Sequence, residues 1–132
     1  MKLRVRFAET DQMGVAHHSS YVLWMEAARV EWLRERGVSY VEMERSGISL
    51  AVSSVNVNYR VAAYFDDEVE VEAKLVEGKS RRFRYVYRLT KVGDNTLLAT
   101  GETTHIPVDR SGRAIRLSKD WLGKLEPHLQ TI

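Results

Sequence analysis

The residues best suited to chemistry gather in one segment near the N-terminus. The stretch "RFAETDQMGVAHHSSYVLWMEAAR" runs from residue 6 to residue 29. Between a predicted strand and a strongly apolar predicted helix it holds a carboxylate, a glycine and two adjacent histidines: Asp11, Gly14, His17 and His18. Backbone N–H groups at the start of a helix have no partner inside it and can hold a developing oxyanion. A carboxylate beside such a site is the minimum equipment for acyl transfer, so the pattern indicates an active-site loop.

Each of these residues, taken alone, also has an ordinary structural explanation. An aspartate after a strand commonly closes a turn with its own side chain. A lone histidine is more often packed or capping than catalytic. A metal site that joins Asp11 to the histidines is disfavoured, because no helical ligand spacing such as H-x-x-x-H supports it. We therefore expect no metal and no cofactor, and the case for a site depends on the residues as a group.

Length and composition limit the class of protein. The chain has 132 residues, of which 44% are hydrophobic and 29% charged, and this is ordinary globular composition. We expect one soluble domain over residues 1–132, without a run long enough to span a bilayer. The sequence has no cysteine, which excludes disulfides, thiolate nucleophiles and zinc sites that need a cysteine.

Charge and the first residues bear on partners and compartment. The segment "MKLRVRFAE" alternates apolar and charged residues and lacks the apolar core of a secretory signal, so we expect the chain in the cytoplasm. The formal net charge of +2 is too slight to indicate nucleic-acid binding. It suits an anionic small molecule as partner.

A strand and a long helix should position the candidate loop. Residues 3–7 alternate apolar and basic side chains, as a strand with one buried face does. From Ser20 to Arg36, apolar side chains cover more than half of a helical wheel, so we expect protein to surround this helix. Ser19 or Ser20 suits its N-cap, and Gly37 suits the residue after its end.

The rest of the chain reads mainly as strands. A short helix is predicted between Ser39 and Gly47, and Ser118 caps a short terminal helix. Period-two alternation predicts strands near residues 55–59, 66–78 and 81–92, and a further strand is expected from about Thr96 to Val108. The stretches "EGKS" and "GDN" are hairpin turns that make the last three strands an antiparallel meander. The fold class is α+β, with about five antiparallel strands that curl around one long helix.

One predicted strand is an exposed edge. The segment with Val55, Val57 and Tyr59 would leave apolar side chains and unpaired backbone groups at the edge of the sheet. Such an edge is commonly covered by pairing with another subunit. We expect a homo-oligomer, at least a dimer.

Nearly the whole chain resembles a known family. The segment "AETDQMGVAHHSSYVLWMEAARVEWLRERG" resembles the acyl-CoA thioesterases of the hotdog fold, specifically the 4-hydroxybenzoyl-CoA thioesterase-like group that includes the Tol-Pal-associated thioesterases. The resemblance continues through "GISLAVSSVNVNYRVAAYFDDEVEVEAKL" and "LLATGETTHIPVDRSGRAIRLS". It implies a sheet wrapped around a central helix, subunits joined edge to edge, and active sites at the interface. The family often has Asn where this chain has Ser20.

The resemblance also implies roles for single residues. The family's catalytic carboxylate falls on Asp11, its loop glycine on Gly14, its loop histidine on His18 and its tyrosine near the helix start on Tyr21. The chain would hydrolyse an acyl-CoA thioester to a free acid and coenzyme A. Asp11 would act as nucleophile or as general base for water.

Other residues would bind the substrate. The backbone N–H groups near His18 and Ser19 would polarise the thioester carbonyl. Gly14 and Val15 would bind the substrate, and Tyr21 would line the acyl pocket. Guanidinium groups match phosphate geometry, so four arginines are candidates to hold the phosphates of coenzyme A. These are Arg60, Arg81, Arg82 and Arg84. A solvated strand face explains the arginines nearly as well.

Two other functions remain open. One is a hotdog-fold dehydratase or hydratase that uses His18 with Glu26 as acid and base. The other is a non-catalytic module that binds acyl groups or nucleic acid through the basic strand face. For Glu26 we favour a simpler role, an ordinary helical ion pair with Arg29.

Overall fold

The computed structural model describes all 132 residues. Its five strands form one sheet in the order β1-β3-β4-β5-β2, and every neighbouring pair is antiparallel. Along the chain the elements are β1 (Lys2–Arg4), the 3₁₀ helix η1 (Phe7–Glu9), α1 (His18–Glu35), α2 (Tyr40–Arg45), β2 (Ser49–Tyr59), β3 (Glu68–Lys79), β4 (Arg82–Lys91), β5 (Leu97–Val108), α3 (Lys119–Leu125) and the 3₁₀ helix η2 (Glu126–His128). The predicted α+β fold with about five antiparallel strands is confirmed.

The predicted meander is present and supplies one wall of the core. β3, β4 and β5 follow one another as antiparallel neighbours. Their period-two alternation separates a buried face from a more exposed one, as expected for a sheet with one packed face. The buried side chains of β3 and β4 are Val69, Val71, Ala73, Leu75, Phe83, Tyr85, Tyr87 and Leu89.

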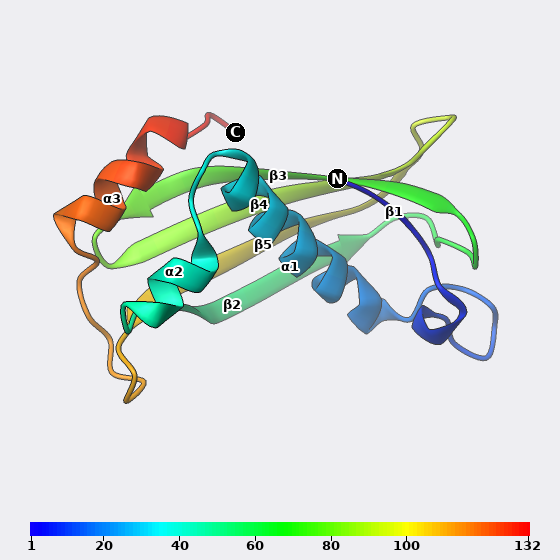
Figure 1. Cartoon of the computed structure of the whole chain (residues 1–132). Coiled ribbons are helices and arrows are strands. Elements are labelled where there is room, and N and C mark those ends of the chain that lie inside the picture. Colours follow the sequence, from blue (N-terminus) through cyan, green and yellow to red (C-terminus); the bar gives the residue numbers. More distant parts are fainter.

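The longest helix, α1, crosses this buried face of the sheet (Figure 1). The side of α1 that meets the strands is apolar and carries Tyr21, Trp24, Met25, Ala28, Trp32 and Leu33. On the opposite side, Leu23 is 57% exposed and Ala27 is also exposed. The expectation that protein surrounds the whole helix is therefore wrong for a single chain, because the sheet covers only one side of α1.

A glycine allows α1 to approach β5 closely. A Cβ atom built on Gly101 would overlap the sulfur of Met25, which is fully buried on α1. Any larger residue at this position would push the helix from the sheet or displace the methionine. Helix and sheet are therefore fixed at the middle of α1, which also fixes where its N-terminus lies.

The first predicted strand is shorter than expected. β1 ends at Arg4, and the chain then turns into η1, so that Phe7 is 78% exposed instead of buried. The turn forms because the Glu9 carboxylate accepts a hydrogen bond from the Arg6 backbone N–H at 2.7 Å. Asp11 thus follows a 3₁₀ turn and not a strand.

The ends of the helices agree with the predictions except at the start of α1. Ser39 caps α2 and Ser118 caps α3, each accepting a backbone N–H bond. Gly37 lies just beyond α1 with a positive φ of 74°. The N-cap of α1 is His17 and neither of the predicted serines, since the Ser19 N–H donates to the His17 ring.

The two edges of the sheet differ in length and composition. β1 has three residues, whereas β2 has eleven and pairs only with β5. The prediction that Val55 and Tyr59 belong to an edge strand is confirmed, and both side chains are exposed. β2 therefore leaves a long unpaired edge that carries exposed apolar side chains.

Candidate active site at the start of helix α1

The loop of residues 10–16 is a closed turn around Asp11. The Asp11 N–H donates to the Val15 carbonyl at 2.8 Å, and the Gly14 N–H donates to the Asp11 carbonyl at 3.1 Å. Asp11 Oδ1 accepts the Met13 N–H at 2.8 Å, so the aspartate closes the turn with its own side chain. Its second oxygen, Oδ2, accepts no hydrogen bond within the chain. Asp11 therefore combines a structural role with one free carboxylate oxygen.

The far side of this loop is attached to the segment that follows β2. The Ala16 N–H donates to the Ala63 carbonyl at 2.7 Å, and Val15 forms an isolated bridge with Tyr64. The hydroxyl of Tyr21 accepts the Ala63 N–H at 3.2 Å. The loop is thus held between the start of α1 and the β2–β3 connection.

Glu9 fixes the base of the loop. Its backbone carbonyl accepts the His17 N–H at 2.8 Å and the Ser20 hydroxyl at 2.9 Å, while its carboxylate accepts the Trp24 indole N–H at 2.7 Å. Burial raises the pKa of Glu9, but hydrogen bonds from Arg6 and Trp24 lower it further, so the net pKa lies below its ordinary value. Sequence reasoning missed this residue, because its contacts with Trp24, His17 and Ser20 join it to residues beyond the loop.

Helix α1 begins with one free amide. The Ser19 N–H donates to His17 Nδ1 at 3.2 Å, whereas the His18 N–H has no acceptor within the chain. The His18 carbonyl accepts the hydroxyl of Tyr59, on the edge strand β2, at 2.7 Å. Of the two amides predicted to polarise a carbonyl, that of His18 is therefore free and that of Ser19 is occupied.

Tyr21 is buried at the base of the site. Its ring meets Trp24 with centroids 4.8 Å apart and Tyr59 at 5.0 Å. Burial raises the pKa of its hydroxyl, which therefore stays protonated at neutral pH. Within one chain Tyr21 belongs to the packed core beneath the loop.

The four predicted phosphate-binding arginines do not form one cluster. Arg60 follows β2, and its N–H donates to the carbonyl of Leu98. Arg84 is in register with Thr104, which lies six residues beyond Leu98 on β5. At the rise of a strand, Leu98 and Thr104 are about 20 Å apart. Arg60 follows the end of β2 that carries Tyr59, while Arg81 and Arg82 lie at the β3–β4 turn at the other end of the sheet.

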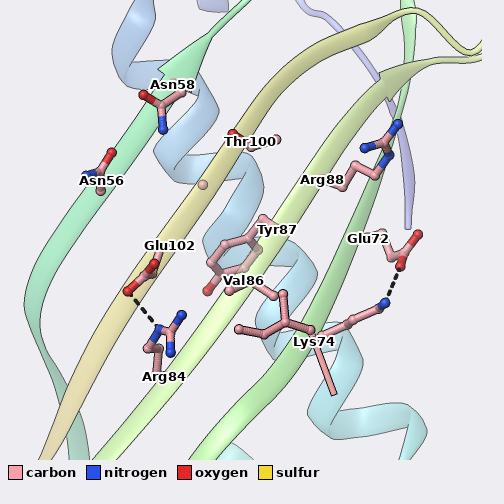
Figure 2. A pocket seen from close by; sticks show the side chains of 12 residues that line it. Asn56, Asn58, Glu72, Lys74, Arg84, Val86, Tyr87, Arg88, Thr100 and Glu102 are labelled. Carbon is pink, nitrogen blue, oxygen red and sulfur yellow. Dashed lines mark hydrogen bonds and ion pairs between the residues drawn. The ribbon is translucent and has the colours of Figure 1, made fainter. Parts of the chain in front are cut away.

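Arg84 lines a shallow cavity on the outer face of the sheet. Figure 2 shows this cavity on the side of the strands away from α1. Its volume is about 410 Å³, and it is lined mainly by polar and charged side chains. Arg84 pairs with Glu102 at 2.8 Å, and Lys74 pairs with Glu72 at 3.6 Å. Most of its charges thus neutralise one another.

The predicted ion pair between Glu26 and Arg29 is absent. Arg29 turns inward, and its guanidinium donates to the hydroxyl of Tyr87 at 3.0 Å. Glu26 stays exposed, eight residues beyond His18, which is about 12 Å along the helix. The acid and base pair predicted for a dehydratase is therefore not brought together within one chain.

The structure contains no group of three or more side chains of the metal-binding types close enough to hold an ion. His105 is buried among the strands and forms a ring contact with Tyr85. Among the helices, none has the combination of length and hydropathy needed to cross a bilayer.

A five-stranded antiparallel sheet, a helix across one face and a carboxylate loop at the start of that helix are consistent with the hotdog class of thioesterases. The chain belongs to the Thioesterase-like superfamily, whose sequence profile matches residues 5–125. It is 30% identical over 107 residues to the acyl-CoA thioester hydrolase YbgC of Escherichia coli O6:H1, an alignment that covers 81% of this chain and 79% of that protein.

Two solved structures resemble this one along nearly its full length. The DHNA-CoA thioesterase of Staphylococcus aureus superimposes with a TM-score of 0.91 at 31% identity, over 96% of this chain and 87% of that chain. The hypothetical protein TT1821 of Thermus thermophilus superimposes with a TM-score of 0.91 at 38% identity, over 97% of both chains.

Proposed function

We propose that this protein is an acyl-CoA thioesterase, which hydrolyses an acyl-CoA thioester to a free acid and coenzyme A. Residues 1–132 would act as one hotdog domain whose sheet curls around α1. Membership of the thioesterase-like family and the activity named for YbgC support the reaction class. The observation that carries the mechanism is the free Oδ2 of Asp11 in the loop that leads to the unpartnered His18 amide.

The His18 amide would bind the thioester carbonyl oxygen, where negative charge develops. Asp11 would then follow one of two routes. As a nucleophile it attacks the carbonyl carbon, expels the coenzyme A thiolate and forms an anhydride that water hydrolyses. As a general base it removes a proton from the water that attacks the same carbon. Both routes use the same free oxygen.

The neighbouring residues would bind and orient the substrate. Gly14 and Val15 border the loop, and the side chain of His18 would orient it or contact the thioester. Ser19 would act through its place beside the His18 amide, and Tyr21 would support the acyl pocket from below. For all five residues these roles rest on their positions around the loop and the start of α1.

Coenzyme A carries phosphates, and arginine is suited to bind them. Arg60 and Arg81 make no ion pair within the chain, whereas Arg82 pairs with Glu77 and Arg84 with Glu102. All four remain candidates, with the two unpaired arginines the first to test. The cytoplasm remains our proposal for the compartment.

The test is the substitution Asp11→Asn. The amide oxygen can still accept the Met13 N–H, so the turn and the melting temperature should change little. Loss of a nucleophile or base should lower kcat by a factor of at least ~100. Thiol release from an acyl-CoA panel measures kcat, and thermal unfolding measures the fold.

Asp109→Asn is a matched control. Asp109 Oδ1 accepts the Ser111 N–H at 2.8 Å in the same type of turn, at a position without a proposed catalytic role. It should keep full turnover. An Asp11→Asn protein that folds and retains normal kcat would remove Asp11 from the mechanism.

A further inference from the structure

A small, partly open cavity lies between α1, α2 and the sheet, apart from the Asp11 loop. Its volume is about 70 Å³, which is room for about two water molecules or one small polar group. The polar residues in its wall are Glu26, Arg29, Tyr40 and Tyr85, and Leu50 at the start of β2 also borders it. The cavity thus combines an apolar lining with several side chains that carry polar atoms.

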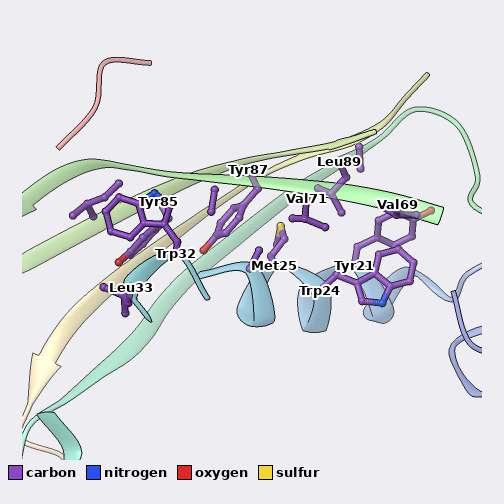
Figure 3. Close-up of a cluster of buried hydrophobic side chains, with 14 of the residues drawn as sticks. Tyr21, Trp24, Met25, Trp32, Leu33, Val69, Val71, Tyr85, Tyr87 and Leu89 are labelled. Carbon is purple, nitrogen blue, oxygen red and sulfur yellow. The ribbon is translucent and has the colours of Figure 1, made fainter. Parts of the chain in front are cut away.

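One buried donor in this wall has no partner. Tyr85 is 1% exposed, and its hydroxyl forms no hydrogen bond within the chain. The adjacent Tyr87 cannot supply one, because its hydroxyl already meets Arg29 at 3.0 Å and Thr103 at 2.7 Å. Figure 3 shows both hydroxyls pointing from the sheet toward α1. Buried polar groups are nearly always paired, so the Tyr85 hydroxyl indicates a partner outside the chain.

Arg29 adds a positive charge without a counter-ion. It is half-buried, takes part in none of the ion pairs of the chain, and uses one nitrogen on Tyr87. His105, beyond Tyr87 and Thr103, stays neutral because burial lowers its pKa to about 4. A desolvated guanidinium favours an anion or another oxygen acceptor. The cavity wall therefore holds the unpaired Tyr85 hydroxyl and a guanidinium whose only hydrogen bond within the chain goes to Tyr87, with the exposed Glu26 at its border.

The edge strand β2 relates this cavity to the candidate active site. Within one chain, His18 and Arg29 are eleven helical residues apart, or about 16 Å. One end of β2 meets the start of α1 through Tyr59, and its other end reaches the cavity at Leu50. If two β2 edges pair antiparallel about their midpoint, Ser54, the Tyr59 end of one subunit lies beside the Leu50 end of its partner. An acyl group held at one loop would then extend toward the partner's cavity.

We propose that this cavity receives the far end of the acyl group and selects acyl groups that end in a hydrogen-bond-accepting oxygen, as a hydroxyl or a carboxylate. The proposal rests on the proposed thioesterase function and on pairing of the β2 edges. Arg29 and Tyr85 donate hydrogen bonds to that oxygen, and the Glu26 carboxylate can accept one from a hydroxyl. A methyl-ended acyl group would leave both donors unpaired, which disfavours it.

The test compares acyl-CoAs of matched length that end in a hydroxyl, a carboxylate or a methyl group, over a ladder of chain lengths. The wild-type protein should favour an oxygen-ended substrate over its methyl-ended counterpart at least tenfold in kcat/KM. Whether the hydroxyl or the carboxylate is favoured identifies the natural source of the oxygen. In Tyr85→Phe and in Arg29→Met this preference should fall at least tenfold, mainly through KM.

Two controls separate recognition from folding. Tyr85→Phe removes a hydroxyl that has no partner in the chain, so its melting temperature should not fall. Arg34→Met removes an exposed arginine that pairs with Glu31 on the same helix, and it should keep the wild-type preference. The cavity's role would be overturned if Tyr85→Phe kept the wild-type preference for oxygen-ended substrates. It would also be overturned if an active wild-type protein showed no such preference. Absence of hydrolysis for every substrate would instead overturn the proposed function.

Discussion

At the scale of single residues, the most informative feature beside the Asp11 loop is a chain of buried polar groups. It runs from Arg29 through Tyr87 and Thr103 to His105, with contacts of 3.0, 2.7 and 2.8 Å. Connected polar groups in a core hold one another in a single arrangement. This network holds the Arg29 side chain in the cavity wall, where the Tyr85 hydroxyl has no hydrogen-bond partner.

The buried histidine makes stability depend on pH. Burial and, to a smaller extent, the Arg29 cation lower the pKa of His105 from 6.5 to about 4. The His105 ring binds a proton near pH 6.5 in the unfolded chain but only near pH 4 in the folded chain. The free energy of unfolding that depends on the neutral ring is therefore fully present above pH 6.5 and is lost as the pH falls from 6.5 to 4. The loss should approach about 3 kcal/mol.

An NMR titration of the imidazole ring and urea unfolding at pH 7 and pH 4 measure this effect. His105→Gln should remove most of the loss of stability over that range, whereas the control His128→Gln should retain it. A ring that titrates near pH 6.5 in the folded protein would contradict the assignment.

At the scale of elements, α1 and β5 approach each other closely where Met25 lies over Gly101. Gly101→Ala places a methyl group against Met25 and should destabilise the protein by about 1–3 kcal/mol. Gly101 has no positive φ, so backbone strain does not complicate the result. A double-mutant cycle with Met25→Ala should show that the two losses are not additive, because the second change removes the overlap.

Urea unfolding gives the required free energies. The control is Gly123→Ala in α3, where a new Cβ meets nothing within 4 Å and helix propensity should rise slightly. Strict additivity of the Gly101 and Met25 losses would show that the helix and the strand are less tightly coupled than the structure indicates.

The strands could be predicted from the sequence because their alternation directly reports which face is buried. Val69 to Leu75 and Phe83 to Leu89 follow this rule without exception. The start of α1 could not be predicted, because Ser19 and Ser20 are both suitable N-caps. The actual N-cap is His17, whose ring accepts the Ser19 N–H. Phe7 was misassigned because η1 depends on the Glu9 carboxylate.

Part of the candidate site was equally visible. Asp11, Gly14 and His18 are close in the sequence, so their grouping needed no knowledge of the fold. Arg29 was interpreted as a surface ion-pair partner, because helical spacing gives neighbours on the helix but not the strand beneath it. Its contact with Tyr87 joins residues 58 positions apart, which only the folded structure reveals.

At the scale of the whole molecule, the exposed β2 edge leads us to propose a homo-oligomer, either a dimer or a dimer of dimers. Val55 and Tyr59 are exposed on a strand of eleven residues with one free edge. Edge-to-edge pairing would satisfy the backbone groups and cover these side chains. Light scattering at micromolar concentration should therefore give at least twice the monomer mass.

Val55→Asp would introduce a charge at this edge and should shift the protein toward monomer, with loss of thioesterase activity if the site needs both subunits. Val41→Asp is the control, because Val41 is also exposed but lies on α2. A monomeric wild-type protein, or a Val55→Asp protein with unchanged mass, would exclude the β2 interface.

The hydrogen bonds of Glu9 have a practical consequence for protein engineering. Because its carbonyl receives both His17 and Ser20, the chain is tied together at the two ends of residues 10–16 independently of what those residues are. We therefore expect the ends of this segment to stay in place when its sequence is changed, and closing a somewhat longer insert costs little extra entropy. Loops from other members of the superfamily should therefore be transplantable at residues 10–16, while Trp24 keeps its hydrogen bond to Glu9.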